Sequence, residues 1–257
     1  MALHAEGLIA HKTIKSLNRA AECAEQVGLS IELILVLDRA TSETRNYVET
    51  SHVVNQATKL VSADFGDLGL TRNYGIQHSN GEYVAILDGD DLISESWLLR
   101  AHELSQLDRR YVVHPEVSVA FDQKALLMYH PDQRQKDFDE ANIIVDNYWT
   151  ALCFSRRETF LHIPYIALPK SSGFGYEDWY WNCEVMARGF IHTVALGTAH
   201  FIRAKEGGGL SGETAMRNAL IPHSAVLENL GNGSRRKRHV VDAANNQEAV
   251  AKAANED

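Results

Sequence analysis

The stretch that decides the fold reads Tyr83-Val84-Ala85-Ile86-Leu87-Asp88-Gly89-Asp90-Asp91. Its first five residues carry no charge and are mostly aliphatic, which predicts a strand buried on both faces, as in a parallel sheet. Acidic residues follow at once. In α/β sheets ligands bind beyond the carboxyl ends of the strands, so carboxylates in this place indicate a ligand site. A second apolar run, residues 31–37, also ends in an acid, Asp38.

The acids after the strand could hold a metal ion. Side chains two positions apart in extended backbone point to the same side, so Asp88 and Asp90 can converge on one ligand. Crowded carboxylates repel each other unless a cation lies between them, and Mg²⁺ and Mn²⁺ prefer oxygen ligands while keeping positions for phosphate oxygens. An acidic turn leading into a helix explains the same residues without any ligand. The short pattern by itself leaves both interpretations open.

Helical and strand-like segments alternate around this stretch. Helices are predicted for residues 14–24, 70–78, 95–107 and 177–188, and strands for residues 31–37, 59–62, 83–87, 111–114, 117–121, 192–196 and 200–203. Pro115 and Glu116 separate two of these strands. Strands that alternate with helices predict an α/β fold whose mostly parallel sheet is covered on both faces.

Composition narrows the class of protein. The chain has 257 residues, of which 45% are hydrophobic and 23% charged, and its net charge is −9. An acidic balance argues against a nucleic-acid partner, because phosphate binding needs clustered Lys and Arg. Neither a run of roughly 20 apolar residues nor a signal-peptide pattern is present, so we expect a soluble, cytoplasmic protein. Its three cysteines form no CxxC pair, which predicts reduced thiols in core packing.

Two segments, residues 69–76 and 81–91, resemble in this order the donor-binding half of family 2 glycosyltransferases with the GT-A fold. Shorter segments agree with this: residues 4–7 and 36–38 resemble the ends of the first two strands of the family, and residues 175–179 resemble its acceptor-side Glu-Asp motif. The resemblance implies a Rossmann-like three-layer sandwich over residues 1–211, with a donor half to about residue 110 and an acceptor half from residue 111. Residues 212–257 would form a loosely attached helical extension.

The resemblance also implies roles for the donor side. The donor would be a nucleotide sugar, UDP-linked, bound with Mn²⁺ or Mg²⁺. Asp38 would contact the base, Asp88 the ribose or a metal-bound water, and Asp90 the metal, with Glu6 beside them. Arg72 would pair with a phosphate or with Asp88, and a surface salt bridge is the alternative.

Further roles follow for the later half of the chain. Asp178, next to Glu177, would be the general base of an inverting transfer to a glycan or lipid-linked acceptor. His200 would be a third metal ligand, and Arg203 would contact the diphosphate. Tyr176 and Trp179 could bind an acceptor sugar, although helical aromatic residues are more often core. The basic run at residues 235–239 suggests either a solvated helix face or attraction to the inner face of a membrane.

Some features depart from the family pattern. The first strand is short, Ala5 stands where many relatives carry Asn, and Leu37 replaces a frequent Asp, so base recognition is predicted less firmly than metal binding. The chain could be part of a larger protein or complex. Three other activities stay open: an aspartyl phosphatase with Asp88 as nucleophile, a nucleotidyltransferase on a similar fold, and a catalytically silent carbohydrate-binding scaffold domain.

Overall fold

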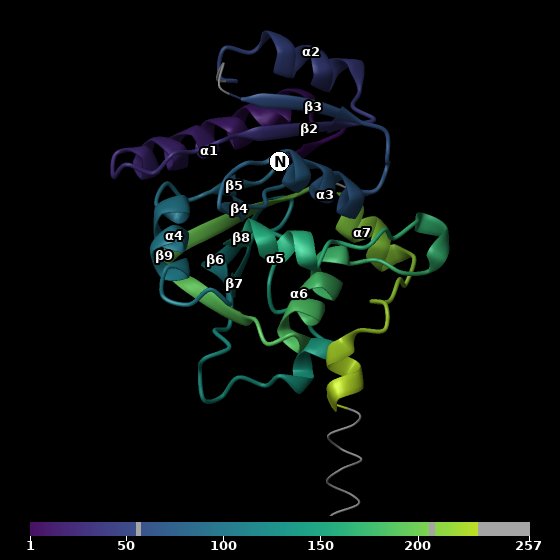
Figure 1. The fold of residues 1–257 in the computed structure, drawn as a ribbon. Coiled ribbons are helices and arrows are strands. Elements are labelled where there is room, and N and C mark those ends of the chain that lie inside the picture. The colour runs from purple at the N-terminus through teal and green to yellow at the C-terminus, as the bar shows by residue number, and fades with distance from the viewer. Residues whose placement is uncertain (55–57, 206–208, 231–257) are drawn as a thin grey trace, which may run out of the picture.

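The computed structural model describes residues 1–54, 58–205 and 209–230. It is an α/β fold with two sheets and helices packed against them (Figure 1). The smaller sheet and helices α1 and α2 form the upper part of the view, and the larger sheet lies below them. A mostly parallel sheet was predicted; parallel pairing holds in the smaller sheet and in one long pair of the larger sheet, whose other pairs are antiparallel.

The smaller sheet is parallel and has the order β1-β2-β3. Its strands are β1 (Ala2–Leu3), β2 (Ile34–Asp38) and β3 (Lys59–Ala63), connected by helices α1 (Ala10–Glu25) and α2 (Ser42–Thr50). Every residue of β2 is buried, as its continuous apolar run predicts. Helix α1 packs Ala10 and Ile14 against the leucines of β1 and β2. The carboxyl end of β2, at Asp38, is followed after a short loop by the start of α2 at Ser42.

The larger sheet has the order β4-β8-β6-β9-β5. Its strands are β4 (Tyr83–Ala85), β5 (Leu92–Ile93), β6 (Tyr111–Asp122), β8 (Phe154–Arg156) and β9 (Ile191–Ala204), and β7 (Leu126–Tyr129) pairs with β6. The helices of this part are α3 (Leu68–His78), α4 (Trp97–Ser105), α5 (Arg157–His162), α6 (Glu177–Ala187) and α7 (Gly209–Met216).

Strands β6 and β9 are each continuous, where the sequence predicts a break. They pair in parallel along their whole length, with a register shift between Pro115 and Val117. The bulge satisfies the backbone groups it displaces: Gly197 N–H donates to Glu116 Oε2 at 2.7 Å, and Glu116 N–H donates to Thr198 Oγ1 at 3.3 Å. Proline is tolerated at a bulge, so Pro115 bends the ladder without ending it.

The region after residue 211 is attached more firmly than predicted. Residues 225–230 are helical, Val226 is buried against α6, and the Ala225 N–H donates to Glu184 Oε1 at 2.7 Å. The Gly175 N–H donates to the carbonyl of Leu220 at 3.0 Å. The prediction of a loose extension is therefore wrong for residues 219–230. The basic run at residues 235–239 and the glycines at 207 and 208 lie outside the described residues.

Three histidines are buried together beneath the larger sheet. His114 Nε2 and His192 Nδ1 are 2.9 Å apart, Trp149 stacks on His192 at a centroid distance of 4.0 Å, and His130 hydrogen-bonds with Ser118. Burial lowers the pKa of His192 to about 3 and that of His130 to about 4, and it holds the pKa of His114 well below the ordinary value. All three are therefore neutral in the folded chain at pH 7.

We expect the folded chain to be sensitive to mild acid. These pKa values lie below the ordinary value of about 6.5, so the unfolded chain takes up protons first, and stability falls as the pH drops below 6.5. Each such histidine would cost roughly 1–2 kcal/mol by pH 5. Thermal melts at pH 7.5 and 5.0 measure the loss. His192→Gln, which cannot titrate, should show a smaller pH dependence; an unchanged dependence would exclude His192 as its source.

Candidate active site

Residues 88–91, called the acidic motif below, begin where the two sheets meet. Ala2 of β1 forms an isolated parallel bridge with Asp88, and β1 pairs with β2 on its other side. A Cβ atom on Gly89 would lie 2.8 Å from the carbonyl oxygen of Ala2 and 2.5 Å from Leu3, so only glycine allows this close approach. Glycine in the motif thus lets β1 hold the turn that carries the aspartates.

Arg72 links the acidic motif to the Glu-Asp motif, which lies far away in the sequence. Its guanidinium donates to Asp88 Oδ1 at 2.8 Å and to Glu177 Oε1 at 2.7 Å, and only 3% of its side chain is exposed. The alternative of a surface salt bridge is therefore wrong. Burial alone would raise the pKa of Asp88, but the adjacent guanidinium outweighs burial and lowers the pKa. One buried cation thus bridges Asp88 and Glu177.

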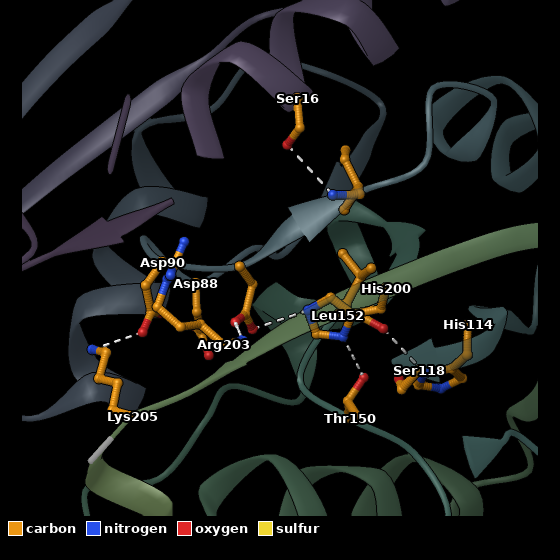
Figure 2. Close-up of polar contacts among 12 residues, drawn as sticks. Ser16, Asp88, Asp90, His114, Ser118, Thr150, Leu152, His200, Arg203 and Lys205 are labelled. Carbon is orange, nitrogen blue, oxygen red and sulfur yellow. Dashed lines mark hydrogen bonds and ion pairs between the residues drawn. The ribbon is translucent and has the colours of Figure 1, made fainter. Parts of the chain in front are cut away.

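Asp90 is paired with a residue that the sequence did not single out. Lys205 Nζ, at the end of β9, lies 2.6 Å from Asp90 Oδ2 (Figure 2). Burial, and then the charge of Asp91, raise the pKa of Asp90 in spite of this lysine. Lys205 follows no recognisable motif, and only the packing of β9 brings it to this carboxylate. The lysine supplies positive charge where a metal ion is predicted.

Both ring nitrogens of His200 have partners within the protein. Its Nε2 is 3.0 Å from Asp91 Oδ2 and its Nδ1 is 2.9 Å from Thr150 Oγ1, so protein groups engage both ring nitrogens (Figure 2). The backbone N–H of Arg203 donates to the other oxygen of Asp91, and its guanidinium pairs with Asp122 at 2.9 Å. In the structure both residues thus hold Asp91 and the end of β9, and the metal-ligand role of His200 and the diphosphate contact of Arg203 stay predictions.

Asp178 lies in the first turn of α6, directly after Glu177. Burial raises the pKa of its carboxyl group to about 7, and the negative charge of Glu177 adds to the effect. Glu177 itself is neutralised by Arg72. The two neighbouring acids therefore differ: one is a fixed carboxylate in an ion pair, and the other exchanges a proton near neutral pH. A general base needs this second behaviour.

Asp38 is engaged by the protein through both of its oxygens. It accepts hydrogen bonds from the N–H groups of Phe65 and Gly66, at 2.7 and 2.9 Å, and from the hydroxyl of Thr71 at 2.7 Å. A direct contact between this carboxylate and a base is therefore not what the structure presents. Asp38 shapes the loop that leads from β3 to α3. Glu6 accepts a hydrogen bond from His4 N–H at 2.5 Å, beside Gly89.

The family follows from a comparison of the whole sequence. The pattern of Glycosyl transferase family 2 matches residues 3–161, more than half of the 257 residues. The chain belongs to this family. No curated protein sequence matches it. Membership of this family argues against the phosphatase alternative. The ion pair with Arg72 also argues against it, because it engages Asp88, which would have been the nucleophile.

Solved structures of S. aureus TarS share the fold of this glycosyltransferase family member. The structure of TarS 1-349 is 15% identical over 79% of this chain, with a TM-score of 0.59, and the match spans 59% of that protein. Its complex with UDP-GlcNAc is 18% identical over 80% of this chain, with a TM-score of 0.56 and 59% of that protein covered. Its complex with UDP is 17% identical over 88% of this chain, with a TM-score of 0.56 and 69% of that protein covered. The predicted GT-A fold is confirmed.

The predicted aromatic residues lie at the start of α6. Tyr176 precedes α6 with φ 60° and ψ 57°, a left-handed conformation that is rare outside glycine. Trp179 packs edge-on against it at 5.8 Å, but the indole N–H donates to the carbonyl of Ile143 at 2.6 Å. Trp181, two positions further along α6, is buried in the core. Acceptor binding by Tyr176 and Trp179 stays a prediction.

The donor set suits a hard cation only in part. Among the described residues, no group of three or more His, Cys, Asp or Glu side chains is placed to hold a metal ion. Asp88 and Asp90 offer carboxylate oxygens at the strand end, and Lys205 already places a cation against Asp90. A two-carboxylate site leaves positions for diphosphate oxygens, which is how Mg²⁺ is commonly bound with nucleotides.

Within the described part of the chain, no helix is long and apolar enough to cross a bilayer.

Proposed function

We propose that the chain is an inverting glycosyltransferase that moves a sugar from a nucleoside-diphosphate sugar to a hydroxyl group of a glycan or a lipid-linked saccharide. One observation carries the proposal: buried Arg72 joins Asp88 of the acidic motif to Glu177, next to Asp178, whose pKa is raised to about 7. A donor-holding carboxylate and a group that can accept a proton thus lie on either side of one guanidinium.

Asp178 is the base in this proposal. It accepts the proton of the acceptor hydroxyl while that oxygen forms a bond to the anomeric carbon and the bond to the diphosphate breaks. Direct displacement of this kind inverts the anomeric configuration. Ionised Asp178 is available at neutral pH because its pKa is near 7, and proton transfer to a base of matched pKa contributes roughly 10²- to 10⁴-fold to the rate.

Asp90 and Asp88 would hold Mn²⁺ or Mg²⁺, with Lys205 giving up Asp90 as the metal and donor enter. The bound cation would supply positive charge against the leaving diphosphate. Lys205 is placed to turn its ammonium group to a phosphate oxygen once it leaves Asp90. Arg72 stays in its ion pairs and keeps Asp88 ionised.

The nucleotide is proposed to be UDP. TarS structures of the same fold hold UDP-GlcNAc and UDP, which supports a UDP-linked donor here. The net charge of −9 supports a saccharide rather than a nucleic acid as the acceptor. We place the reaction in the cytoplasm, with the acceptor either free or presented at the inner face of the membrane.

A nucleotide screen tests the proposal. UDP with Mn²⁺ should raise the melting temperature, whereas UDP with a chelator should not, because a ligand that binds only the folded chain stabilises it by mass action. Incubation with a panel of nucleotide sugars should then show metal-dependent hydrolysis of one donor. If no nucleoside diphosphate stabilises the chain with either metal, the donor site is excluded. Release of phosphate from simple esters would favour a phosphatase instead.

A further inference from the structure

The chain from the last turn of α7 onward runs along helix α6 and contacts both of its ends (Figure 1). Residues 213–226 are called the C-terminal segment below. Ahead of α6, the N–H of Gly175 donates to the carbonyl of Leu220 at 3.0 Å. In the later turns of α6, Glu184 Oε1 accepts from the N–H of Ala225 at 2.7 Å. One segment thus holds the loop that enters α6 and the far end of the same helix.

The contact ahead of α6 is a bridge between two extended backbones. Phe174 and Leu220 form an isolated parallel bridge. The N–H of Leu220 donates to the carbonyl of Gly173 at 3.1 Å, and its own carbonyl accepts from Gly175. Both backbone groups of Leu220 are therefore used, whereas the residue as a whole is 68% exposed. The backbone of Leu220, rather than its side chain, makes this attachment.

The attached loop has an unusual conformation. Gly173 has a φ of 77° and Tyr176 a φ of 60°, so two left-handed residues lie on either side of the bridge. A residue other than glycine is unfavourable in this conformation and keeps it only where the surrounding structure fixes it. The bridge to Leu220 fixes the backbone directly ahead of Tyr176. The backbone angles of Tyr176 in turn decide where the first turn of α6 directs Glu177 and Asp178.

The C-terminal segment also packs closely against this loop. A Cβ atom at position 175 would lie 2.3 Å from Cγ2 of Thr214 and 3.4 Å from Cβ of Ala219. The backbone of Gly175 is not left-handed, so the close approach of Thr214, rather than the backbone conformation, requires glycine here. Lys170, further back in the loop, pairs with Glu213 at 2.6 Å. Apolar and charged contacts of the segment thus meet the same loop.

The far end of α6 is held by burial. Val226 is buried in one cluster with Cys183 and Met186 of α6. The matched pattern of Glycosyl transferase family 2 ends at residue 161, ahead of both α6 and the C-terminal segment. The attachment is therefore a feature of this chain that the family match does not include.

We propose that the C-terminal segment positions the two acids at the start of α6, with Leu220 and Thr214 as positioning residues. Leu220 holds the loop through its backbone, Thr214 packs against Gly175, and together they fix the left-handed turn at Tyr176. Both act through this loop and not through contact with a ligand. The catalytic consequence rests on the proposed glycosyl transfer: a loosened loop misdirects Asp178, while the aspartates after β4 still bind the donor.

Leu220→Pro and Leu220→Ala form a matched pair of variants of the full chain. Proline removes the N–H that donates to Gly173, whereas alanine keeps both backbone groups and removes only an exposed side chain. Leu220→Pro should lower kcat about 10- to 100-fold and change the donor KM by less than about twofold, because a small misplacement of a catalytic group is that costly. Leu220→Ala should keep the kcat of the unaltered chain.

Gly175→Ala provides an independent variant with a rescue. Its added methyl group would collide with Cγ2 of Thr214, and Thr214→Ser removes that carbon while it keeps the hydroxyl. Gly175→Ala should lose kcat as Leu220→Pro does, and the double variant Gly175→Ala/Thr214→Ser should regain most of it. An unchanged kcat in Leu220→Pro would overturn the proposal. So would a double variant that is no faster than Gly175→Ala alone.

The indole N–H signals of two tryptophans in α6 test the positioning without any assay of activity. Trp179, in the first turn, donates to the carbonyl of Ile143 at 2.6 Å, and Trp181 donates to the carbonyl of Ile163 at 2.7 Å in the core. In heteronuclear NMR spectra, Leu220→Pro should shift the Trp179 signal and leave the Trp181 signal in place.

Two spectroscopic results would also overturn the proposal. Movement of both indole signals would show that the C-terminal segment supports the whole fold rather than this loop. An unmoved Trp179 signal would show that the segment does not position the first turn of α6. If the unaltered chain transfers no sugar, the proposed function fails, while the Trp179 signal still decides whether the segment positions this turn.

Discussion

Asp178→Asn is expected to lower kcat by about 10²- to 10⁴-fold while the donor still binds. Asparagine keeps the size of the side chain but cannot accept the proton of an acceptor hydroxyl. The ion pair between Arg72 and Glu177 persists in the variant, so the donor side keeps its geometry. Initial rates with saturating donor and acceptor measure the loss, and the melting-temperature shift with UDP and Mn²⁺ measures donor binding.

The pH profile provides a second readout for the same residue. Because the pKa of Asp178 is raised to about 7, kcat/KM of the unaltered enzyme should fall about tenfold per pH unit below 7 and level off above it. Asp146→Asn, a change of the same kind at an exposed position outside the proposed site, serves as the control and should leave rate and profile unchanged. If Asp178→Asn retains the rate of that control, Asp178 is not the base.

Asp90→Ala is expected to abolish the metal-dependent part of nucleotide binding. In the unaltered chain, UDP and Mn²⁺ at about 100 times their Kd should stabilise the fold by about 2.7 kcal/mol, which corresponds to a melting-temperature rise of roughly 5–10 °C. Without the Asp90 carboxylate the metal loses one of its two proposed ligands, and the rise should shrink to about 1 °C or less.

The control for this variant is Asp64→Ala, because Asp64 is also an aspartate in an ion pair, with Arg39, but is exposed. It should keep the full rise. Manganese binding in the absence of nucleotide, followed by electron paramagnetic resonance, separates the metal from the donor. An unchanged rise in Asp90→Ala would place the metal elsewhere in the chain.

Local patterns predicted the family and the acids that follow two apolar runs, but not the partners of these acids. The run that ends in Asp88 could be recognised from the sequence because its unbroken series of apolar residues and the acids that follow lie in one short segment. The partners depend on packing across the fold: Arg72 and Glu177 are 105 positions apart, and Asp90 meets Lys205 only because β9 ends there. His200 suggested a metal ligand because sequence alone does not show Asp91 and Thr150 on either side of it.

The same limit explains the strand β6. Proline in a strand indicates an interruption when the neighbouring strand is unknown. Only the pairing with β9 shows that the Gly197 N–H donates to the Glu116 carboxylate and that Thr198 Oγ1 accepts from the Glu116 N–H, so that the ladder continues past the bulge. Helix α6 was predicted almost to the residue, since its acids at the start and its glycine after the end are local signals.

The double ion pair of Arg72 has a consequence for how this sequence can change over evolutionary time. A buried guanidinium that loses one carboxylate keeps a costly, half-compensated charge, so loss of Asp88 or Glu177 alone is heavily penalised. Once one of these two carboxylates is lost, replacing the other changes the free energy of unfolding by a different amount than in the intact pair, because the effects of contacting residues are not additive. We therefore expect residues 72, 88 and 177 to be substituted together. A lineage that has lost one of the three should have replaced the other two as well.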